Sequence, residues 1–321
     1  MNNANRNSNK PITSFLSPAD SGLSFSVATL FTFAVSLIYT IVVMVLATKN
    51  GMTATEYSDA MQGDYLFNVI SYLLSALGLF AVIAFFGFYK KQPPLFITKT
   101  TANPKFWISA LLMAFGLLFG FSELNNVFIG FLEKFGYAKP DMYIPNEHWY
   151  EVVTWVVLVG LFPAILEECV FRGYLLEGLK KFGTAFAVVV GGLLFSLFHK
   201  NPQQTPYQFI CGMAYALLAI KSGSILPCIA MHFANNATIL ITNFFKVSFN
   251  QTTTIVLTVI GLISFIAGVV ILLLSKTQKV NTEPNENHIN HTKKGFFLFA
   301  FIGIAICALM WFSDLFAYIG G

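Results

Sequence analysis

The sequence predicts an all-α fold: a polytopic membrane helix bundle with eight or nine transmembrane helices. Two observations lead to this class. The 321 residues are 56% hydrophobic and only 11% charged, whereas charged residues make up about a quarter of a typical soluble domain. Apolar segments also recur along the chain, and several reach the roughly 20 residues that a helix needs to cross a bilayer. The sequence therefore indicates an integral, multi-pass membrane protein whose first partner is the lipid bilayer.

The candidate crossings follow one another along the whole chain. The fifth and sixth are short for a full span, so we expect them to be tilted, broken or partly re-entrant, which would reduce the count to eight. The nine segments are 25–47, 65–89, 106–131, 151–176, 184–199, 206–220, 224–245, 254–274 and 296–318.

Composition divides the chain into four parts. Residues 1–20 are polar and Asn-rich without the apolar region of a cleaved signal, so we expect a disordered tail followed by a retained anchor. Residues 21–149 form N-terminal transmembrane helices, and residues 150–245 form the central helices. Residues 246–321 hold C-terminal transmembrane helices, with a polar loop at 276–295.

The basic residues predict an orientation. Pairs such as Lys90–Lys91 and Lys180–Lys181 fall on the side of the N-terminus, so the positive-inside rule places that terminus in the cytoplasm, and we expect the plasma membrane. The net charge of +4 is spread over loops, which argues against nucleic acid as a partner. The four cysteines lie in apolar stretches without a C-x-x-C pair, so we interpret them as small apolar residues.

A cluster of charges interrupts the fourth segment. Glu167, Glu168 and Arg172 lie in an otherwise apolar stretch, where each ionised side chain costs roughly 2.5–3.5 kcal/mol on insertion scales. Glu168 and Arg172 are four residues apart and share a helix face, so they can pair. Glu167 points about 100° away and keeps its carboxylate free. Both acids could simply balance Arg172, but two acids for one base leave one over, which suits a general acid or base.

Two further polar motifs follow in the next helices. Phe195-Ser-Leu-Phe-His199 ends the fifth segment, and His232-Phe-Ala-Asn-Asn236 lies in the seventh. His199 alone is typical of an interfacial histidine, and His232 with Asn236 could be interhelical hydrogen-bonding residues. His232 and Asn236 are four apart, so both can present donors to one point. The three motifs together, in consecutive central helices, indicate a functional site.

These side chains suit the activation of water. A carboxylate and an imidazole can activate it for attack on a carbonyl, and a second imidazole with an amide can stabilise the oxyanion. No G-x-S-x-G nucleophile motif is present. Glu167, His199 and His232 are also a possible set of zinc ligands. The H-E-x-x-H spacing is missing, so we rank this alternative second and expect no cofactor.

The ordered motifs E-E-x-x-x-R, F-x-x-x-H and H-x-x-x-N resemble those of the CAAX-processing and bacteriocin-processing (CPBP, or Abi) intramembrane proteases. That family includes the type II CAAX prenyl endopeptidases. The resemblance covers residues 150–245 and implies an intramembrane endopeptidase that cuts a peptide or a membrane protein. It implies that Glu167 and His199 activate water, that His232 and Asn236 form the oxyanion site, and that Glu168 and Arg172 support them. Bacterial members are associated with bacteriocin immunity.

The predicted topology places two candidate site residues at different depths in the membrane. It places Glu167 in the cytoplasmic half of its helix but His199 near the outer end of the next. A re-entrant connection at 200–206 around a water cavity is our preferred solution.

Two other classes of function stay open. One is a non-catalytic bacteriocin-immunity or scaffolding protein, and the other is a transporter with a Glu–His proton relay, although we find no inverted repeats. The sequence does not predict the substrate, the need for prenylation or the oligomeric state.

Overall fold

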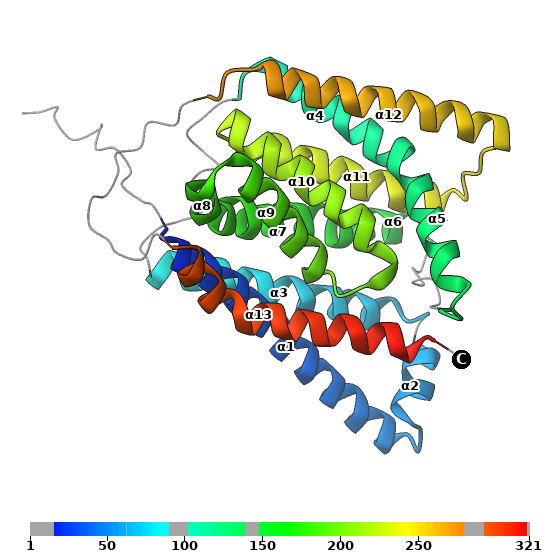
Figure 1. The fold of residues 1–321 in the computed structure, drawn as a ribbon. Helices are drawn as coiled ribbons and strands as arrows, with labels where there is room; N and C mark the ends of the chain where they lie inside the picture. Colours follow the sequence, from blue (N-terminus) through cyan, green and yellow to red (C-terminus); the bar gives the residue numbers. More distant parts are fainter. Residues whose placement is uncertain (1–15, 62, 90–101, 139–147, 279–291, 320–321) are drawn as a thin grey trace, which may run out of the picture.

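The computed structural model describes residues 16–61, 63–89, 102–138, 148–278 and 292–319 (Figure 1). Within these ranges every regular element is a helix, and one isolated bridge pairs Tyr137 with Ile319. The all-α class is therefore confirmed for this part of the chain.

The helices form three groups in Figure 1. The central segments α6 to α11 lie between α4 and α12 on one side and α1, α3 and α13 on the other. The helices are α1 (Pro18–Lys49), α2 (Ala54–Met61), α3 (Tyr65–Tyr89), α4 (Pro104–Phe115), α5 (Ser122–Glu133), α6 (Trp149–Trp155), α7 (Phe162–Glu168), α8 (Leu176–Leu179), α9 (Thr184–Phe198), α10 (Thr205–Ser222), α11 (Leu226–Phe244), α12 (Gln251–Leu274) and α13 (Lys293–Ala317). Wide π-helical turns at Gly116–Phe121, Val156–Leu161 and Cys169–Leu175 join α4 to α5, α6 to α7 and α7 to α8.

Within the described parts of the chain, six stretches of helix are long and apolar enough to cross a membrane. They are Pro18–Lys49, Tyr65–Phe88, Pro104–Glu133, Trp149–Phe182, Gln251–Leu274 and Lys293–Ala317. The predicted count of eight or nine is not reached by this measure. Helix α9 has only 15 residues, and α10 and α11 contain Gln, Lys, His or Asn residues. Two of the three helices outside the count, α9 and α11, carry polar motifs.

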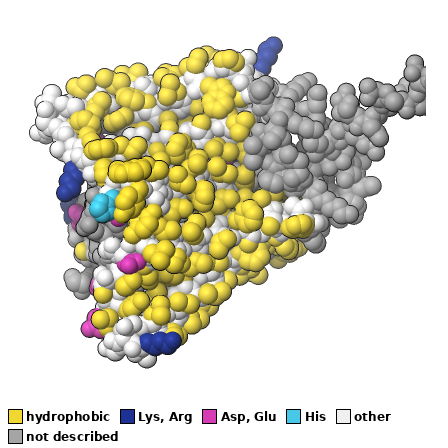
Figure 2. Space-filling view, turned by 180° about the vertical axis from the view of Figure 1, so that it is seen from behind, with side chains coloured by type: hydrophobic (Ala, Val, Ile, Leu, Met, Phe, Trp, Pro, Cys, Tyr) yellow, Lys and Arg dark blue, Asp and Glu magenta, His cyan; other side chains and the backbone are white. Residues whose placement is uncertain are grey.

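The outer helices expose their apolar side chains. Ile38 on α1, Ile263 on α12 and Leu298 on α13 are 59%, 61% and 68% exposed. Hydrophobic side chains cover the middle of the face seen in Figure 2, and the visible charged side chains lie mostly toward its edges. Such a continuous apolar surface is unfavourable in water and fits a hydrocarbon environment. The protein is thus an integral, multi-pass membrane protein.

The segment that carries the charge cluster is buried on all sides. Every residue from Glu168 to Leu179 is buried, including the charged residues Glu168, Arg172 and Glu177, so this segment lies in the interior of the bundle. All four cysteines are free and buried, as the sequence predicts for small apolar side chains.

Some predicted boundaries are wrong. Helix α1 already begins at Pro18, inside the predicted tail, because Ser17 and Asp20 form a capping box. The segment predicted from 224 begins as helix α11 only at Leu226, because Gly223 ends α10 in a left-handed conformation (φ 65°). Helix α13 begins at Lys293, within the predicted polar loop, after the Thr292 cap. The remaining residues of the tail (1–15) and of the loop (279–291) lie outside the described residues.

Helices α9 and α10 meet at two glycines. A Cβ atom on Gly212 would lie 2.8 Å from the Cα of Gly192, so the backbones touch where neither residue has a side chain. Small residues allow this close approach between membrane helices. The contact brings the Phe195–His199 motif on α9 next to α10 and places the Gly212 carbonyl beside Arg172.

Candidate active site

Glu168 joins two of the predicted motifs. Its Oε1 atom accepts hydrogen bonds from Arg172 Nη1 and from His232 Nδ1, both at 3.0 Å. The Glu168 side chain is fully buried. The predicted Glu168–Arg172 pair is therefore confirmed, and the structure adds His232 as a third member that the sequence analysis did not foresee. A buried charge pair is favourable only when further hydrogen bonds complete it; here Oε1 has two donors, whereas Glu168 Oε2 is buried without a partner among the described residues.

Arg172 is held on its remaining sides by α9 and α10. Its Nη2 atom donates to the Gly212 carbonyl at 3.1 Å. The guanidinium carbon lies 4.4 Å from the centre of the Phe195 ring and 5.1 Å from that of Tyr215. Aromatic faces stabilise a guanidinium away from water. Phe195, the first residue of the second motif, thus acts on the first motif.

His232 is fixed in orientation by its neighbours. Its ring stacks on Tyr215 with centroids 5.2 Å apart and 19° between the planes, while Nδ1 faces Glu168. A carboxylate only accepts hydrogen bonds, so Nδ1 carries a hydrogen and donates it. The Nε2 atom takes no part in this hydrogen bond. It donates only when the ring also carries a second proton, a form whose charge the Glu168 carboxylate can balance.

His199 has a defined tautomer for a similar reason. Its Nδ1 atom lies 2.9 Å from the backbone carbonyl of Phe195, which can only accept, so Nδ1 carries the hydrogen. The Nε2 atom of the neutral ring then keeps its lone pair. The Phe195 ring meets both histidine rings edge-on, with centroids 4.9 Å from His199 and 5.9 Å from His232.

Glu167 is the acid that Arg172 does not bind. It is half-buried, and its Oε2 atom is buried without a hydrogen-bond partner among the described residues. Its carboxylate lies within electrostatic range of His199, and His199 lies within such range of His232. His199 and His232 both contact the Phe195 ring, and His232 binds Glu168, one residue after Glu167. Three different helical segments thus contribute to this cluster.

Asn236 is placed differently. Its side-chain nitrogen donates to the Val159 carbonyl at 3.4 Å, and its oxygen accepts from Asn235 at 3.3 Å. The Asn235 oxygen in turn accepts from Tyr207 at 2.6 Å. No hydrogen bond described for Asn236 reaches the other candidate residues. Tyr207 and Asn235 belong to this polar chain, and no motif in the sequence singled them out.

The turn after His199 is fixed by α13. The Thr205 side chain accepts a hydrogen bond from Trp311 Nε1 at 2.8 Å, and the Thr205 carbonyl accepts from Ser196 at 2.7 Å. A short helical turn at Pro202–Gln204 connects α9 to α10 and packs against α5 and α13. Trp311 lies far from every motif in the sequence, so only the folded chain could reveal this contact.

Lys200 is a charged neighbour that the sequence analysis placed outside the site. It adopts a left-handed conformation with φ 54°, which is uncommon for a residue other than glycine. Its ammonium lies 5.1 Å from the centre of the Phe198 ring and within electrostatic range of Glu167. In the sequence, only its position directly after His199 connects Lys200 with the site.

The alternative zinc set does not fit the geometry. Glu167, His199 and His232 supply the right atoms, but among the described residues no three His, Cys, Asp or Glu side chains are grouped closely enough to hold one metal ion. Zinc binding in a tetrahedral site requires ligand atoms at about 2.0–2.2 Å from the metal. We therefore derive no step through a metal.

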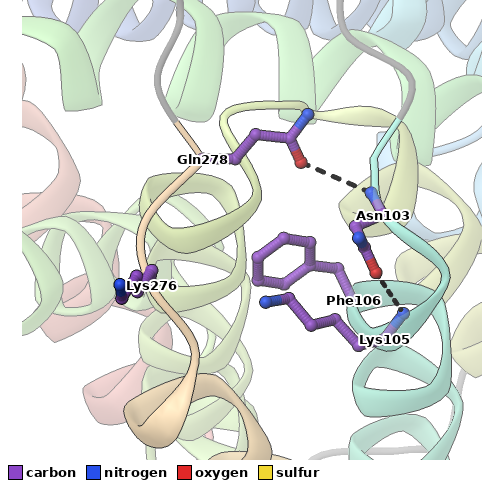
Figure 3. Close-up of a pocket in the computed structure, with 5 residues that line it drawn as sticks. All are labelled: Asn103, Lys105, Phe106, Lys276 and Gln278. Atoms are coloured by element: carbon purple, nitrogen blue, oxygen red, sulfur yellow. Dashed lines mark hydrogen bonds between the residues drawn. The ribbon is translucent and has the colours of Figure 1, made fainter.

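A cavity of about 290 Å³ lies away from these residues (Figure 3). It is lined by Asn103, Lys105 and Phe106 at the start of α4 and by Lys276 and Gln278 after α12. The Gln278 side chain accepts from the Asn103 backbone nitrogen at 3.3 Å. None of the candidate site residues lines this cavity. The candidate active site is therefore defined by the polar residues described above.

Comparison with known protein families matches the stretch of chain that contains the three motifs. Residues 149–238 match the family model described as type II CAAX prenyl endopeptidase Rce1-like. The match covers all three motifs and confirms the resemblance to CAAX-type proteases for this stretch. No curated protein and no solved structure matched the chain. Helices α1 to α5, α12 and α13 lie outside the matched residues.

Proposed function

We propose, on the premise that residues 149–238 are a match to the Rce1-like endopeptidase family, that the protein is an intramembrane endopeptidase that uses a glutamate-activated water. The observation that carries this proposal is that Phe195 contacts both His199 and His232, while His232 binds Glu168, the residue after Glu167. In a membrane, ionisable groups are costly and usually mark a functional site. A cluster of three such groups, two of them with a free ring nitrogen, has the composition of a hydrolytic site.

The residues have separate roles in this proposal. Glu167 removes a proton from water, which His199 orients through its free Nε2 atom. The water oxygen attacks the carbonyl carbon of the peptide, and the carbonyl oxygen becomes an oxyanion. The C–N bond then breaks, and Glu167 returns the proton to the leaving amine. The products are a carboxylic acid and a free amine.

His232 and Asn236 are the proposed oxyanion donors. For His232 to donate through Nε2 while Nδ1 donates to Glu168, both nitrogens must carry hydrogen. We infer that Glu168 balances the charge of this imidazolium, so it is a positioning residue as well as the partner of Arg172. One oxyanion donor contributes about 10²- to 10³-fold to kcat in well-studied hydrolases.

Nine transmembrane segments with a cytoplasmic N-terminus, or eight if one of the short helices does not cross, remain our proposal for topology, with the plasma membrane as the location. Each predicted segment coincides with one helix or with a joined series of helices. Helix α9 is about 22 Å long at 1.5 Å per residue, shorter than the hydrocarbon core of about 30 Å. A connection at 200–206 that stays within the membrane would place His199 at the depth of Glu167 and so remove the predicted difference in depth.

The test is cleavage by purified protein in detergent of a library of fluorescent peptides, with and without a farnesyl group. We expect cleavage by wild type in the presence of a strong chelator. Glu167→Gln should lose at least about 10²-fold in kcat while it remains folded, because the neutral amide cannot accept the proton from water. Glu133→Gln, at an exposed position on α5, is the matched control and should cleave normally.

Two results would contradict the mechanism. Normal cleavage by Glu167→Gln would show that Glu167 is not the general base. Cleavage that is lost with chelator and restored by zinc would favour the metal-dependent alternative instead.

A further inference from the structure

A chain of three hydrogen bonds joins α10, α11 and the π-helical turn at Val156–Leu161. The Tyr207 hydroxyl donates to Asn235 Oδ1 at 2.6 Å, and Asn235 Nδ2 donates to Asn236 Oδ1 at 3.3 Å. Asn236 Nδ2 donates in turn to the Val159 carbonyl at 3.4 Å. This hydrogen-bond chain contains Asn236, a proposed oxyanion donor, together with Tyr207 and Asn235, to which no motif assigns a role.

The acceptor at one end of the hydrogen-bond chain is related to a proline. A residue in an α-helix donates its N–H to the carbonyl four residues earlier, but Pro163 in α7 has no N–H to donate to Val159. In membrane helices, a side chain from a neighbouring helix can supply the missing donor. The Val156–Leu161 turn packs against α11, and Asn236 on α11 supplies a donor to this carbonyl.

The Val159 carbonyl fixes the direction of the whole hydrogen-bond chain. A carbonyl only accepts, so Asn236 must present its NH₂ group to Val159 and its oxygen to Asn235. Asn235 must then present its own NH₂ group to Asn236 and its oxygen to Tyr207. That oxygen needs a donor, which the Tyr207 hydroxyl provides. Reversal of either amide would bring two acceptor oxygens face to face.

The fixed orientation leaves one N–H of Asn236 for another acceptor. The NH₂ group has two hydrogens, and among the described hydrogen bonds it donates only to Val159. Asn236 is partly exposed, whereas Asn235 is only 3% exposed, so Asn236 is the more accessible of the two to a substrate. His232 lies one turn earlier on the same face of α11, so both proposed oxyanion donors lie on one side of this helix.

We propose that Tyr207 and Asn235 are positioning residues that orient the Asn236 amide and keep one of its N–H groups available for the oxyanion. This inference rests on the proposed endopeptidase function, in which Asn236 stabilises the oxyanion. A donor that is already oriented needs no reorganisation when negative charge develops on the substrate oxygen. Loss of this orientation should therefore lower kcat and leave KM nearly unchanged.

The first variants change the hydrogen-bond chain and keep Asn236. For a fluorescent peptide that wild type cleaves, Tyr207→Phe should lower kcat about 3- to 10-fold, the effect of one neutral hydrogen bond. Asn235→Asp should lower kcat at least about 10-fold, because a carboxylate still accepts from Tyr207 but turns an oxygen toward Asn236 Oδ1. Tyr65→Phe is the matched control, since it removes a hydroxyl that lies 2.8 Å from the Thr154 hydroxyl, between α3 and α6. It should cleave as wild type does.

A second set of variants tests whether Tyr207 acts through Asn236. Asn236→Ala alone should lower kcat about 10²- to 10³-fold, the effect of one oxyanion donor. Adding Tyr207→Phe to Asn236→Ala should then cause no further loss, because no amide remains to be oriented. A purely structural role of Tyr207 would instead lower kcat by the same factor in both backgrounds. Thermal unfolding in detergent should show that each variant is folded at the assay temperature.

The outcomes separate this inference from the proposed function. Normal kcat in both Tyr207→Phe and Asn235→Asp, with activity lost in Glu167→Gln and Asn236→Ala, would overturn the positioning role and leave the endopeptidase intact. An equal effect of Tyr207→Phe with and without the Asn236 side chain would also overturn it. Normal cleavage by Asn236→Ala would do the same, because the amide would have no catalytic role. Normal cleavage by Glu167→Gln would instead contradict the proposed mechanism itself.

Discussion

At the scale of single residues, the site depends on one shared carboxylate. Glu168 Oε1 accepts from both Arg172 and His232, so the charge that pairs with the arginine also orients the proposed oxyanion donor. Arg172 is in turn held by Gly212 and by the Phe195 and Tyr215 rings. Removing one member leaves the others buried and uncompensated, which costs more than the pair itself contributes.

Arg172→Met should therefore destabilise the protein by about 3–5 kcal/mol, because it removes one member of a buried charge cluster and leaves His232 as the partner of Glu168. Thermal unfolding in detergent measures this effect. The double variant Glu168→Gln with Arg172→Met should recover part of the loss, since it removes both charges. Lys134→Met, at an exposed site after α5, is the control. Equal stability of the single variant and wild type would show that the pair does not stabilise the fold.

At the scale of elements, a helix outside the family match fixes a loop inside it. Trp311 on α13 donates to Thr205 at the start of α10, and Ser196 on α9 donates to the Thr205 carbonyl. The turn that begins at His199 is thus held at Thr205, where α10 begins, by hydrogen bonds to α9 and α13. Because His199 must keep its Nε2 atom toward Glu167 for the proposed reaction, the position of this turn affects catalysis.

Trp311→Phe should lower kcat by about 3- to 10-fold with little change in KM, because it removes a hydrogen bond worth about 1 kcal/mol that positions the turn. Thr205→Val should have a similar effect, and the double variant should lose little more than either single variant. Steady-state kinetics on the cleaved peptide provide the measurement. Trp107→Phe, on the exposed side of α4, is the control. Strictly additive losses would show that the two residues act independently.

At the scale of the whole molecule, the fold encloses polar helices within apolar ones. Helices α1, α3, α12 and α13 expose large apolar side chains, whereas the Glu168–Leu179 segment is buried throughout. This arrangement lets α9, α10 and α11 keep polar residues that lipid alone would not tolerate. It also explains why only six stretches of the described residues meet the criterion of length and composition for a membrane crossing.

The topology with nine transmembrane segments predicts that Lys276 after α12 lies on the cytoplasmic side and Lys134 after α5 on the opposite side. Single cysteines at these positions, Lys276→Cys and Lys134→Cys, should react with a membrane-impermeant thiol reagent from opposite faces of the membrane. Background labelling should be low because all four native cysteines are buried. Labelling of both positions from the same face would require an even number of crossings between residues 134 and 276 and would refute the proposed nine.

The sequence by itself determined the all-α membrane class, the stretch that resembles CAAX-type proteases and the Glu168–Arg172 pair. Apolar length and i, i+4 spacing are local properties, so they can be read along the chain. Only the tertiary structure decided that His232 binds Glu168, that Phe195 and Tyr215 surround Arg172 and that Trp311 holds the turn after His199. These contacts join residues that helix packing brings together, and no period in the sequence encodes which helix faces meet.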